Sequence, residues 1–185
     1  MIGPRSIQAG LGGTLLLSAL LFVSVSSASA NQQLTVQLRD DCDPATFNAA
    51  VGPGTCVRQG STTFAEFFAQ LRRNKSVDGW RFNPDHAGLH VGDSLVATNR
   101  GGEQHTFTRV AQFGGSIVPP IDAALGNPAP PPECGAAVRI ASGASDPSDP
   151  AAPRVAGSPA LPVGQNLFQC CIHPWMRTAV TVSKT

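Results

Sequence analysis

The chain has 185 residues, of which 14% are charged, and its formal net charge is +1. This balance gives no sign of the clustered basic surface that a nucleic-acid-binding protein needs, so we expect no nucleic-acid partner. The 16 prolines and 19 glycines predict a loop-rich fold. Roughly 155 residues follow the first 30, enough for one domain with its own core.

Residues 1–30 have the pattern of a secretory signal peptide. Arg5 supplies a positive start, an apolar run extends from Leu11 to Val25, and Ala28-Ser29-Ala30 is a cleavage site of the A-x-A kind. An uncleaved membrane anchor is the alternative, but about 15 apolar residues fall short of the ~20 that span a bilayer. We expect cleavage after Ala30, export to the periplasm or the cell exterior, and no membrane span in the mature protein.

The first strand is predicted from Leu34 to Arg39, where apolar and polar residues alternate. Cys42 and Cys56 then bracket a segment rich in Gly, Pro and Ala, for which we expect little regular structure. In an oxidising compartment these cysteines favour a disulfide, which contributes ~3 kcal/mol in the chain-entropy model. A metal site formed with neighbouring acids is the alternative, and the lack of a nearby His disfavours it.

A helix is predicted over Ser61–Arg73. Its apolar residues recur with a spacing of three and four, at Phe64, Phe67, Phe68 and Leu71. Thr63 and Glu66 fit a capping box, and the two arginines at the end suit the negative end of the helix dipole. A partner-binding helix is the alternative, but an aromatic stripe at this spacing is more often part of a core.

The stretch from Trp80 to Asn99 predicts strands that lead toward a possible metal ligand. Trp80 and Phe82 fall on one face and are expected in the core. We interpret His86 and His90 as surface histidines, because His90 stands between two apolar residues and alternates outward.

The stretch from Gln112 to Cys134 is rich in proline, which we take to exclude a helix or a central strand. Residues 136–140 are expected to form a short strand. Residues 143–162, in which Ser-Asp-Pro occurs twice, predict an exposed and flexible connection without a chemical role.

The stretch from Phe168 to Met176 places a thiol, an imidazole and a thioether within nine residues. At the spacing Cys170-x-x-His173-x-x-Met176, one tight loop can aim all three at a single metal ion, and Pro174 fixes the backbone after the His. Thiolate and thioether favour Cu(I) and imidazole binds both copper states, so the set suits copper. A trigonal site with a weak axial sulfur needs a second His. His105, which restarts a strand after a loop with two glycines, is the candidate.

These residues resemble the cupredoxins, the single-domain blue copper proteins of the plastocyanin and amicyanin type. The resemblance lies in Val91–Asn99, in His105-Thr106-Phe107 and in the Cys-x-x-His-Pro-x-Met loop. It implies an all-β, Greek-key β-sandwich over residues 31–185, to which this chain adds one amphipathic helix and long Pro/Gly-rich loops. It also implies one type 1 copper, held by His105, Cys170 and His173 with Met176 as the long axial ligand.

The chain departs from many cupredoxins directly after the first copper ligand, where Thr106 stands in place of Asn. By the resemblance, this neighbour helps to tie the ligand strands together by hydrogen bonding, a role that Thr106 or Asn99 would take here. Trp175 is expected near the surface beside the solvent side of His173. There it serves as an electron port or as a lid that keeps water off the metal.

A second disulfide is expected between Cys134 and Cys171. Neighbours on a strand face opposite ways, so Cys171 cannot share the metal with Cys170. A bond between Cys170 and Cys171 is the alternative, and it would destroy the copper site. Thr178–Ser183 alternates and is expected to be the last strand of the sandwich.

The expected function is outer-sphere, one-electron transfer by a monomer with a redox partner protein, without enzymatic catalysis. Four protein ligands leave no open position for a substrate or water. A copper carrier or resistance protein is the alternative, but Met- or His-rich tracts would favour that role and the chain has only Met1 and Met176. Structural zinc is disfavoured because zinc rarely takes Met. Length and the lack of His-x-His motifs argue against a multicopper oxidase or a nitrite reductase.

Overall fold

A computed structural model of the chain describes residue 3 and residues 32–146 and 161–184. The described residues from 32 onward belong to one compact unit, Asn31–Thr185, and residue 3 lies outside it. The predicted signal peptide and the centre of the predicted 143–162 connection lie outside the described residues. Among the described residues, none of the helices combines the length and apolar character needed to cross a membrane.

The first large sheet has the strand order β2-β1-β4-β8. Its strands are β1 (Gln33–Arg39), β2 (Arg81–Asn83), β4 (Ser94–Asn99) and β8 (Ser145–Asp146). β1 pairs antiparallel with β2 and parallel with β4, so the end of β1 lies beside the end of β4. The predicted first strand is therefore present, whereas Ser145 and Asp146, predicted to be in a flexible connection, form an edge strand.

The second large sheet has the order β3-β10-β9-β6. Its strands are β3 (His86–His90), β6 (Thr108–Val110), β9 (Gly164–Gln169) and β10 (Arg177–Ser183). β10, the predicted last strand, lies between β3 and β9. A third, two-stranded sheet pairs β5 (His105–Thr106) with β7 (Arg139–Ile140). His105 is the first residue of β5, and residues 170–176 connect β9 to β10.

The core lies between the two large sheets. Phe82 of β2 contacts Phe107 at a ring-centroid distance of 5.3 Å, and Phe107 stacks on Phe168 of β9 at 4.5 Å. These rings connect one sheet to the other. The inward-facing residues Val36, Leu38, Leu95, Val180 and Val182 are also buried. Burial of each such side chain contributes about 1.5–3 kcal/mol.

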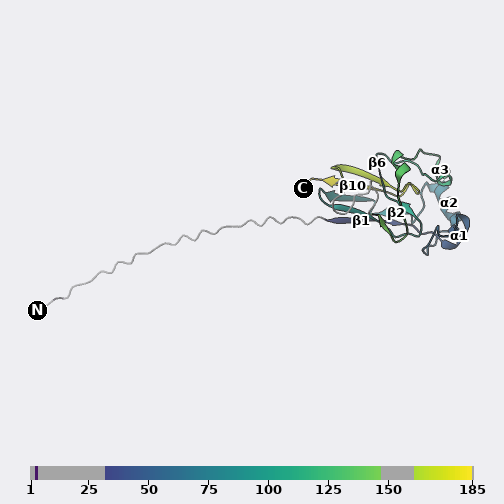
Figure 1. Ribbon diagram of the computed structural model, residues 1–185, viewed down its shortest axis with the longest axis horizontal. Helices are drawn as coiled ribbons and strands as arrows, with labels where there is room; N and C mark the ends of the chain where they lie inside the picture. Colours follow the sequence, from purple (N-terminus) through teal and green to yellow (C-terminus); the bar gives the residue numbers. More distant parts are fainter. Residues whose placement is uncertain (1–2, 4–31, 147–160, 185) are drawn as a thin grey trace. The chain divides into compact units, whose positions relative to one another are not determined.

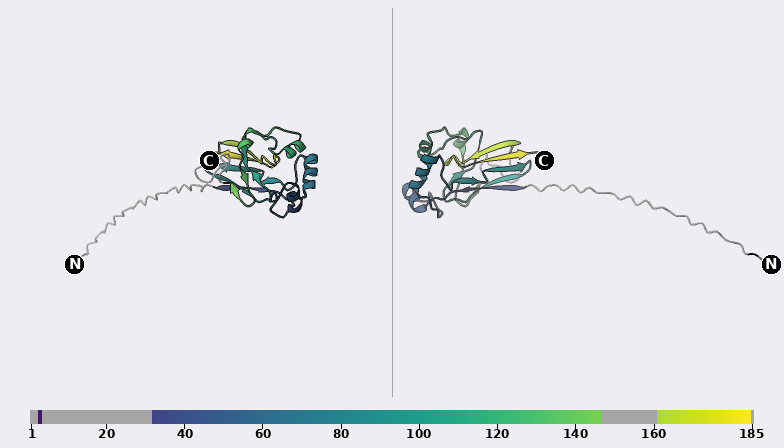
Figure 2. Two further views of the ribbon diagram at one scale, coloured as in Figure 1. Left: turned by 45° about the vertical axis from the view of Figure 1, so that its right-hand side comes forward. Right: turned by 180° about the vertical axis from the view of Figure 1, so that it is seen from behind.

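Three α-helices lie together at one end of the sheets (Figures 1 and 2). They are α1 (Pro44–Ala50), α2 (Phe64–Asn74) and α3 (Pro119–Leu125), and a 3-10 helix, η1, covers Pro132–Ala136. In α2, the hydroxyl of Thr63 accepts from the amide of Glu66 and the Glu66 carboxylate accepts from the Thr63 amide, which confirms the predicted capping box. The prediction of an all-β fold with one added helix is therefore wrong in its helix content.

α1 lies between Cys42 and Cys56, where the sequence predicts little regular structure. The Asp43 side chain accepts hydrogen bonds from the amides of Ala45 and Thr46, and Pro44 occupies the first turn. A helix start leaves its first amides without internal partners, so Asp43 satisfies two of them. The prediction of little regular structure between Cys42 and Cys56 is therefore wrong for Pro44–Ala50, because it used composition and did not consider the N-cap at Asp43.

α3 contradicts the prediction that proline excludes a helix between Gln112 and Cys134. Pro119 and Pro120 occupy its first turn, where no amide hydrogen bond is required and the fixed φ suits the helix. Gly126 ends the helix with a φ of 100°, a left-handed conformation that glycine adopts without strain. Proline therefore starts this helix.

Candidate metal centre

Three predicted ligands come together in the structure. The Nδ1 atoms of His105 and His173 are 3.2 Å apart, and the Cys170 Sγ atom lies 3.9 Å from each of them. His105 is in β5, and the other two residues belong to the loop between β9 and β10. All three side chains are at most 2% exposed. The set of one sulfur and two imidazole nitrogens suits copper, and also zinc, so the residues present fit a metal ion.

The ligand loop is closed by backbone hydrogen bonds. The Cys170 amide donates to the Met176 carbonyl at 3.0 Å, and the Met176 amide donates to the His173 carbonyl at 2.9 Å. Arg177 also donates from Nε to the Pro174 carbonyl at 2.6 Å. Because the two ends of the loop bond to each other, the backbone restricts the positions of Cys170 and His173.

The surroundings of Cys170 favour a thiolate. The amides of Thr106 and His173 donate to its Sγ at 3.3 and 3.4 Å. Burial acts to raise the pKa of Cys170, but hydrogen bonds with His105 and His173 outweigh it and hold the pKa well below its ordinary value. The thiolate is the form that binds metals.

Thr106 connects the two ligand segments. Its hydroxyl accepts a hydrogen bond from the Cys171 amide at 2.7 Å, while its own amide donates to Cys170 Sγ. Asn99 acts inside the loop that precedes His105: its side-chain amide donates to the carbonyls of Glu103 and Ile140, and its Oδ1 accepts from the Gly101 amide. Of the two residues named for this role in the sequence, Thr106 joins the ligand segments, whereas Asn99 bonds to the loop before His105 and to β7.

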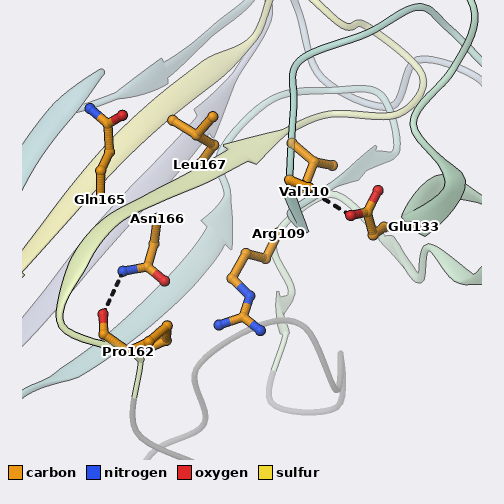
Figure 3. A pocket seen from close by; sticks show the side chains of 8 residues that line it. Arg109, Val110, Glu133, Pro162, Gln165, Asn166 and Leu167 are labelled. Carbon is orange, nitrogen blue, oxygen red and sulfur yellow. Dashed lines mark hydrogen bonds between the residues drawn. The ribbon is translucent and has the colours of Figure 1, made fainter.

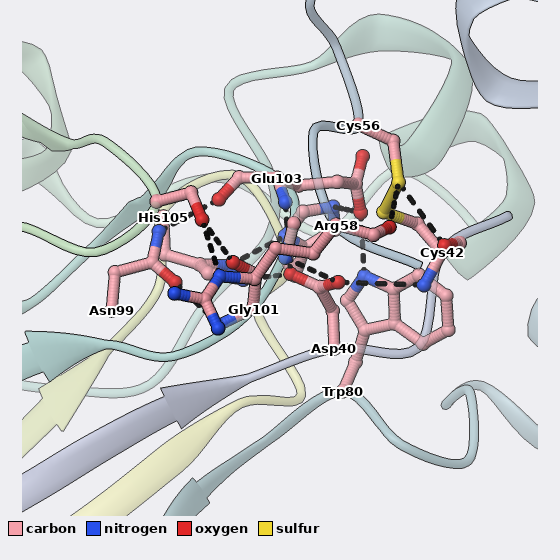
Figure 4. A network of polar contacts seen from close by, with 12 residues as sticks. Asp40, Cys42, Cys56, Arg58, Trp80, Asn99, Gly101, Glu103 and His105 are labelled. Carbon is pink, nitrogen blue, oxygen red and sulfur yellow. Dashed lines mark hydrogen bonds and ion pairs between the residues drawn. A yellow bond between two sulfur atoms is a disulfide. The ribbon is translucent and has the colours of Figure 1, made fainter. Parts of the chain in front are cut away.

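Asp40 lies directly behind His105 and was not singled out by sequence reasoning. Its Oδ2 is 2.8 Å from His105 Nε2, and both side chains are buried (Figure 4). Burial acts to raise the pKa of Asp40, but His105 and the amides of Gly102 and Glu103 lower it to about 2. Burial acts to lower the pKa of His105, but its bonds to Asp40 and Cys170 raise it to about 9.

Glu103 occupies the corresponding position behind His173, and it too was missed. Its Oε2 is 3.6 Å from His173 Nε2 and accepts a hydrogen bond from the Trp80 indole at 2.7 Å. Burial raises the pKa of Glu103, and the charge of His173 opposes this rise. The sequence offers one indication of Glu103, since an acidic residue stands two positions before the predicted ligand His105.

Aromatic rings cover the outer side of His173. Its ring centroid lies 6.0 Å from that of Phe67 in α2, 6.5 Å from Trp80 and 5.5 Å from Trp175. His173 is 2% exposed, which corrects the expectation of a solvent-side His. Trp175 is half-buried, and its ring also lies 5.8 Å from that of Phe67. The predicted added helix therefore forms a cover over the site.

A pocket of about 490 Å³ opens at this helical end and reaches His173 and Glu103. Its walls are mainly apolar and come from α1, α2 and α3, with Phe47, Phe64, Phe67 and Ile121 among the lining residues. A second pocket, of about 650 Å³, is lined by residues of the paired strands β6 and β9 and by Glu133, which accepts from the Ala111 amide (Figure 3). None of the described residues that line the second pocket belongs to the ligand cluster.

Met176 is fully buried and forms part of the core that adjoins the cluster. Its backbone closes the ligand loop, and its role as an axial ligand stays a prediction. His86 and His90 are exposed on β3 and take no part in the cluster. His86 lies 3.4 Å from Asp85, and His90 lies 3.0 Å from the Ser183 hydroxyl.

Two disulfides flank the site. They join Cys42 to Cys56 and Cys134 to Cys171, the same pairings that the sequence suggests, and Cys170 is left as a free thiol. The second disulfide attaches the segment around η1 to the residue that follows Cys170. The side chain of Cys171 is thereby directed away from the ligand cluster.

Comparison of the sequence with protein-family models and with curated proteins gave no match. Solved structures similar to this one are cupredoxins. A purple cupredoxin from Nitrosopumilus maritimus is 16% identical, with 58% of this chain and 86% of that chain covered and a TM-score of 0.36. Oxidised plastocyanin from Dryopteris crassirhizoma is 14% identical, with 81% and 100% covered and a TM-score of 0.38. A reduced Cu(I) form of an amicyanin variant is 18% identical, with 56% and 73% covered and a TM-score of 0.33.

Proposed function

We propose that this protein is an exported type 1 copper protein with a cupredoxin-like, Greek-key sandwich, and that it transfers single electrons. The observation that carries the proposal is the buried cluster of His105, Cys170 and His173. Its three donor atoms lie 3.2–3.9 Å apart, and two backbone amides point at the sulfur.

Each ligand has a distinct part in this proposal. Cys170 would bind as a thiolate and the two histidines through Nδ1, while Met176 would be the weak axial ligand. Bound copper would supply a one-electron couple between Cu(I) and Cu(II). The closed loop and the hydrogen bonds of Thr106 hold the ligands in one arrangement, which suits a reaction in which no ligand has to be exchanged.

The route for the electron is proposed to run through the helical end of the domain. Trp175 is half-buried and packs on His173 at a ring-centroid distance of 5.5 Å, so it joins the buried ligand to the surface. A redox partner protein would contact this end. Because the chain is nearly neutral overall, we expect apolar contact to matter more there than a long-range attraction between opposite net charges.

Copper carriage is the other use of such a site. A carrier needs ligands that exchange readily, whereas the three ligands here are at most 2% exposed and are held by the backbone. Burial of the ligands therefore favours retained copper and electron transfer.

The test is addition of Cu(II) to the protein spanning residues 31–185, which form one compact unit. We expect an intense visible band from thiolate bonding and a narrow copper hyperfine splitting in the EPR spectrum. A colourless protein that holds only Cu(I) or only zinc would contradict electron transfer and favour carriage or a structural role. The export part of the proposal predicts that the protein recovered outside the cytoplasm begins at Asn31, as read by N-terminal mass spectrometry.

A further inference from the structure

The two histidines share one arrangement. Their Nδ1 atoms point toward each other and toward Cys170, and each Nε2 atom faces a carboxylate: Asp40 at 2.8 Å and Glu103 at 3.6 Å. An imidazole that donates from one nitrogen to a carboxylate offers its other nitrogen to a metal. The hydrogen bond between His105 Nε2 and Asp40 therefore matches the expected metal-binding side of that ring, and Glu103 places a carboxylate 3.6 Å from the same nitrogen of His173.

The Asp40 carboxylate is itself fixed in place. The amides of Gly102 and Glu103 donate to its two oxygens at 2.9 and 3.0 Å, in addition to the contact with His105 (Figure 4). Gly101 lies so close to this carboxylate that any side chain at position 101 would collide with it. The loop before His105 is thus shaped around Asp40.

The Glu103 carboxylate is fixed by a different partner. Its Oε2 accepts from the Trp80 indole at 2.7 Å, and Trp80 stacks between α1 and the site, with its ring 5.9 Å from Phe47. Burial of an acid costs free energy unless it is hydrogen-bonded or paired with a positive charge. Two such acids beside the same cluster therefore indicate a common role toward the group that the cluster binds.

We propose that Asp40 is a positioning residue that holds His105 with the proton on Nε2, that Glu103 faces the same nitrogen of His173, and that the negative charge of both acids favours Cu(II) over Cu(I). This inference rests on the proposed copper site. A negative charge beside the metal stabilises the ion of higher charge more, so the two carboxylates lower the reduction potential. Asp40 has the larger effect because its contact with the imidazole is shorter.

The competing interpretation is that Asp40 only closes the loop around Gly102 and Glu103. Asp40→Asn separates the two roles, because it preserves the shape of the side chain and removes its charge. A loop-closing role predicts a loss of stability with an unchanged potential. The positioning role predicts a change of potential with a defined sign.

The experiment compares the reduction potentials of the copper-loaded protein and three variants. Asp78→Asn is the matched control, because Asp78 is exposed, lines the same surface hollow as Asp40 and carries the same charge. For Asp40→Asn we expect the ratio of the Cu(II) to the Cu(I) binding constant to fall about tenfold, equal to a rise of about 59 mV for one electron. Glu103→Gln should raise the potential less, and Asp78→Asn should leave it unchanged.

The proposal for Asp40 would be overturned if the reduction potential of Asp40→Asn equalled that of the unmutated protein. It would also be overturned if Asp40→Asn and Asp78→Asn raised the potential equally, because a general effect of charge would then explain both. The same comparison decides the case of Glu103. When the unmutated protein shows the thiolate band and these shifts are missing, only the positioning role fails. When the band itself is missing, the proposed function fails first.

A second measurement avoids any variant that fails to fold. In the diamagnetic Cu(I) form of the unmutated protein, proton NMR should find the Nε2 proton of His105 shifted far downfield, as a hydrogen bond to a carboxylate requires. An Nε2 proton at the chemical shift of a water-exposed imidazole would overturn the positioning of His105, whereas a proton on Nδ1 would overturn its binding to copper.

Discussion

The two sides of the ligand cluster differ in what surrounds each histidine. Behind His105 lies a polar network in which Asp40 accepts two backbone amides, whereas His173 lies under the rings of Phe67, Trp80 and Trp175. Hydrogen bonds fix the orientation of a side chain, while packed rings exclude water and contact one another through apolar surfaces. The polar side therefore orients the imidazole of His105. The aromatic side keeps water away from His173 and includes the half-buried Trp175.

We expect the largest effect from the loss of the Cys170 thiol, because its sulfur contacts both His105 and His173. We expect Cys170→Ala to abolish the intense visible band of the copper-loaded protein. Cys171→Ala, the neighbouring change, removes a disulfide and should keep the band while lowering the melting temperature. Colour that survives Cys170→Ala, measured by absorption spectroscopy, would overturn the ligand assignment.

The aromatic side should dominate stability. Phe67 is 2% exposed and its ring lies near five others, those of Phe47, Phe68, Trp80, His173 and Trp175. Phe67→Ala should lower the free energy of unfolding by about 3–5 kcal/mol, as for other large core residues. Phe68→Ala is the control, because Phe68 is half-buried and should cost clearly less in denaturant unfolding. Equal losses would mean that α2 is not anchored through Phe67.

The polar side should make the metal-free protein sensitive to pH. The pKa of His105 is raised from 6.5 to about 9, so the stability from its pairing is present below pH 6.5 and is lost as the pH rises through 9. The pKa of Asp40 is lowered from 3.8 to about 2, so its contribution is present above pH 3.8 and is lost as the pH falls toward 2.

From pH 6.5 to pH 9 the loss of the His105 pairing should lower the melting temperature of the metal-free protein, while the lowered pKa of Cys170 acts in the opposite direction. The melting temperature of the unmutated protein, followed by circular dichroism, should therefore decline over this range relative to that of Asp40→Asn, and Asp78→Asn should behave like the unmutated protein. A decline that is the same in all three proteins would assign it to groups other than the His105 pair.

We expect the smallest effect from Met176, which belongs to neither the polar side nor the aromatic side of the cluster. Met176→Gln should retain copper and lower the reduction potential, because a harder axial oxygen stabilises Cu(II). Met176→Leu controls for packing, since it conserves volume and removes the sulfur. The same potential in both variants, measured by voltammetry, would mean that Met176 is not axial.

Local patterns in the sequence were sufficient to predict α2 and the loop that carries Cys170 and His173. A capping box, an apolar stripe and a short ligand spacing all lie within a few residues of each other. The two carboxylates could not be found in this way. Asp40 reaches the loop before His105 only because β1 and β4 pair in parallel, which places residues about sixty positions apart side by side.

The missed helices have a different cause. For α3, the prediction rests on the number of prolines in the segment and not on their positions. Pro119 and Pro120 stand in the first turn, the place in a helix where proline fits. For α1, the cap at Asp43 was hidden in a segment whose composition is typical of loops. The burial of His173 could not be foreseen either, because it depends on where α2 packs.

The pairing of Cys134 with Cys171 has a consequence for how the protein matures. A chain with five cysteines that forms disulfides within itself must leave one thiol over. In this fold the remaining thiol is Cys170, the neighbour of a cysteine that is already bonded. Correct pairing therefore leaves Cys170, the sulfur of the proposed metal site, unbonded, whereas a chain that pairs Cys170 before it folds loses this ligand. We expect the order of folding and oxidation to affect the yield of metal-binding protein.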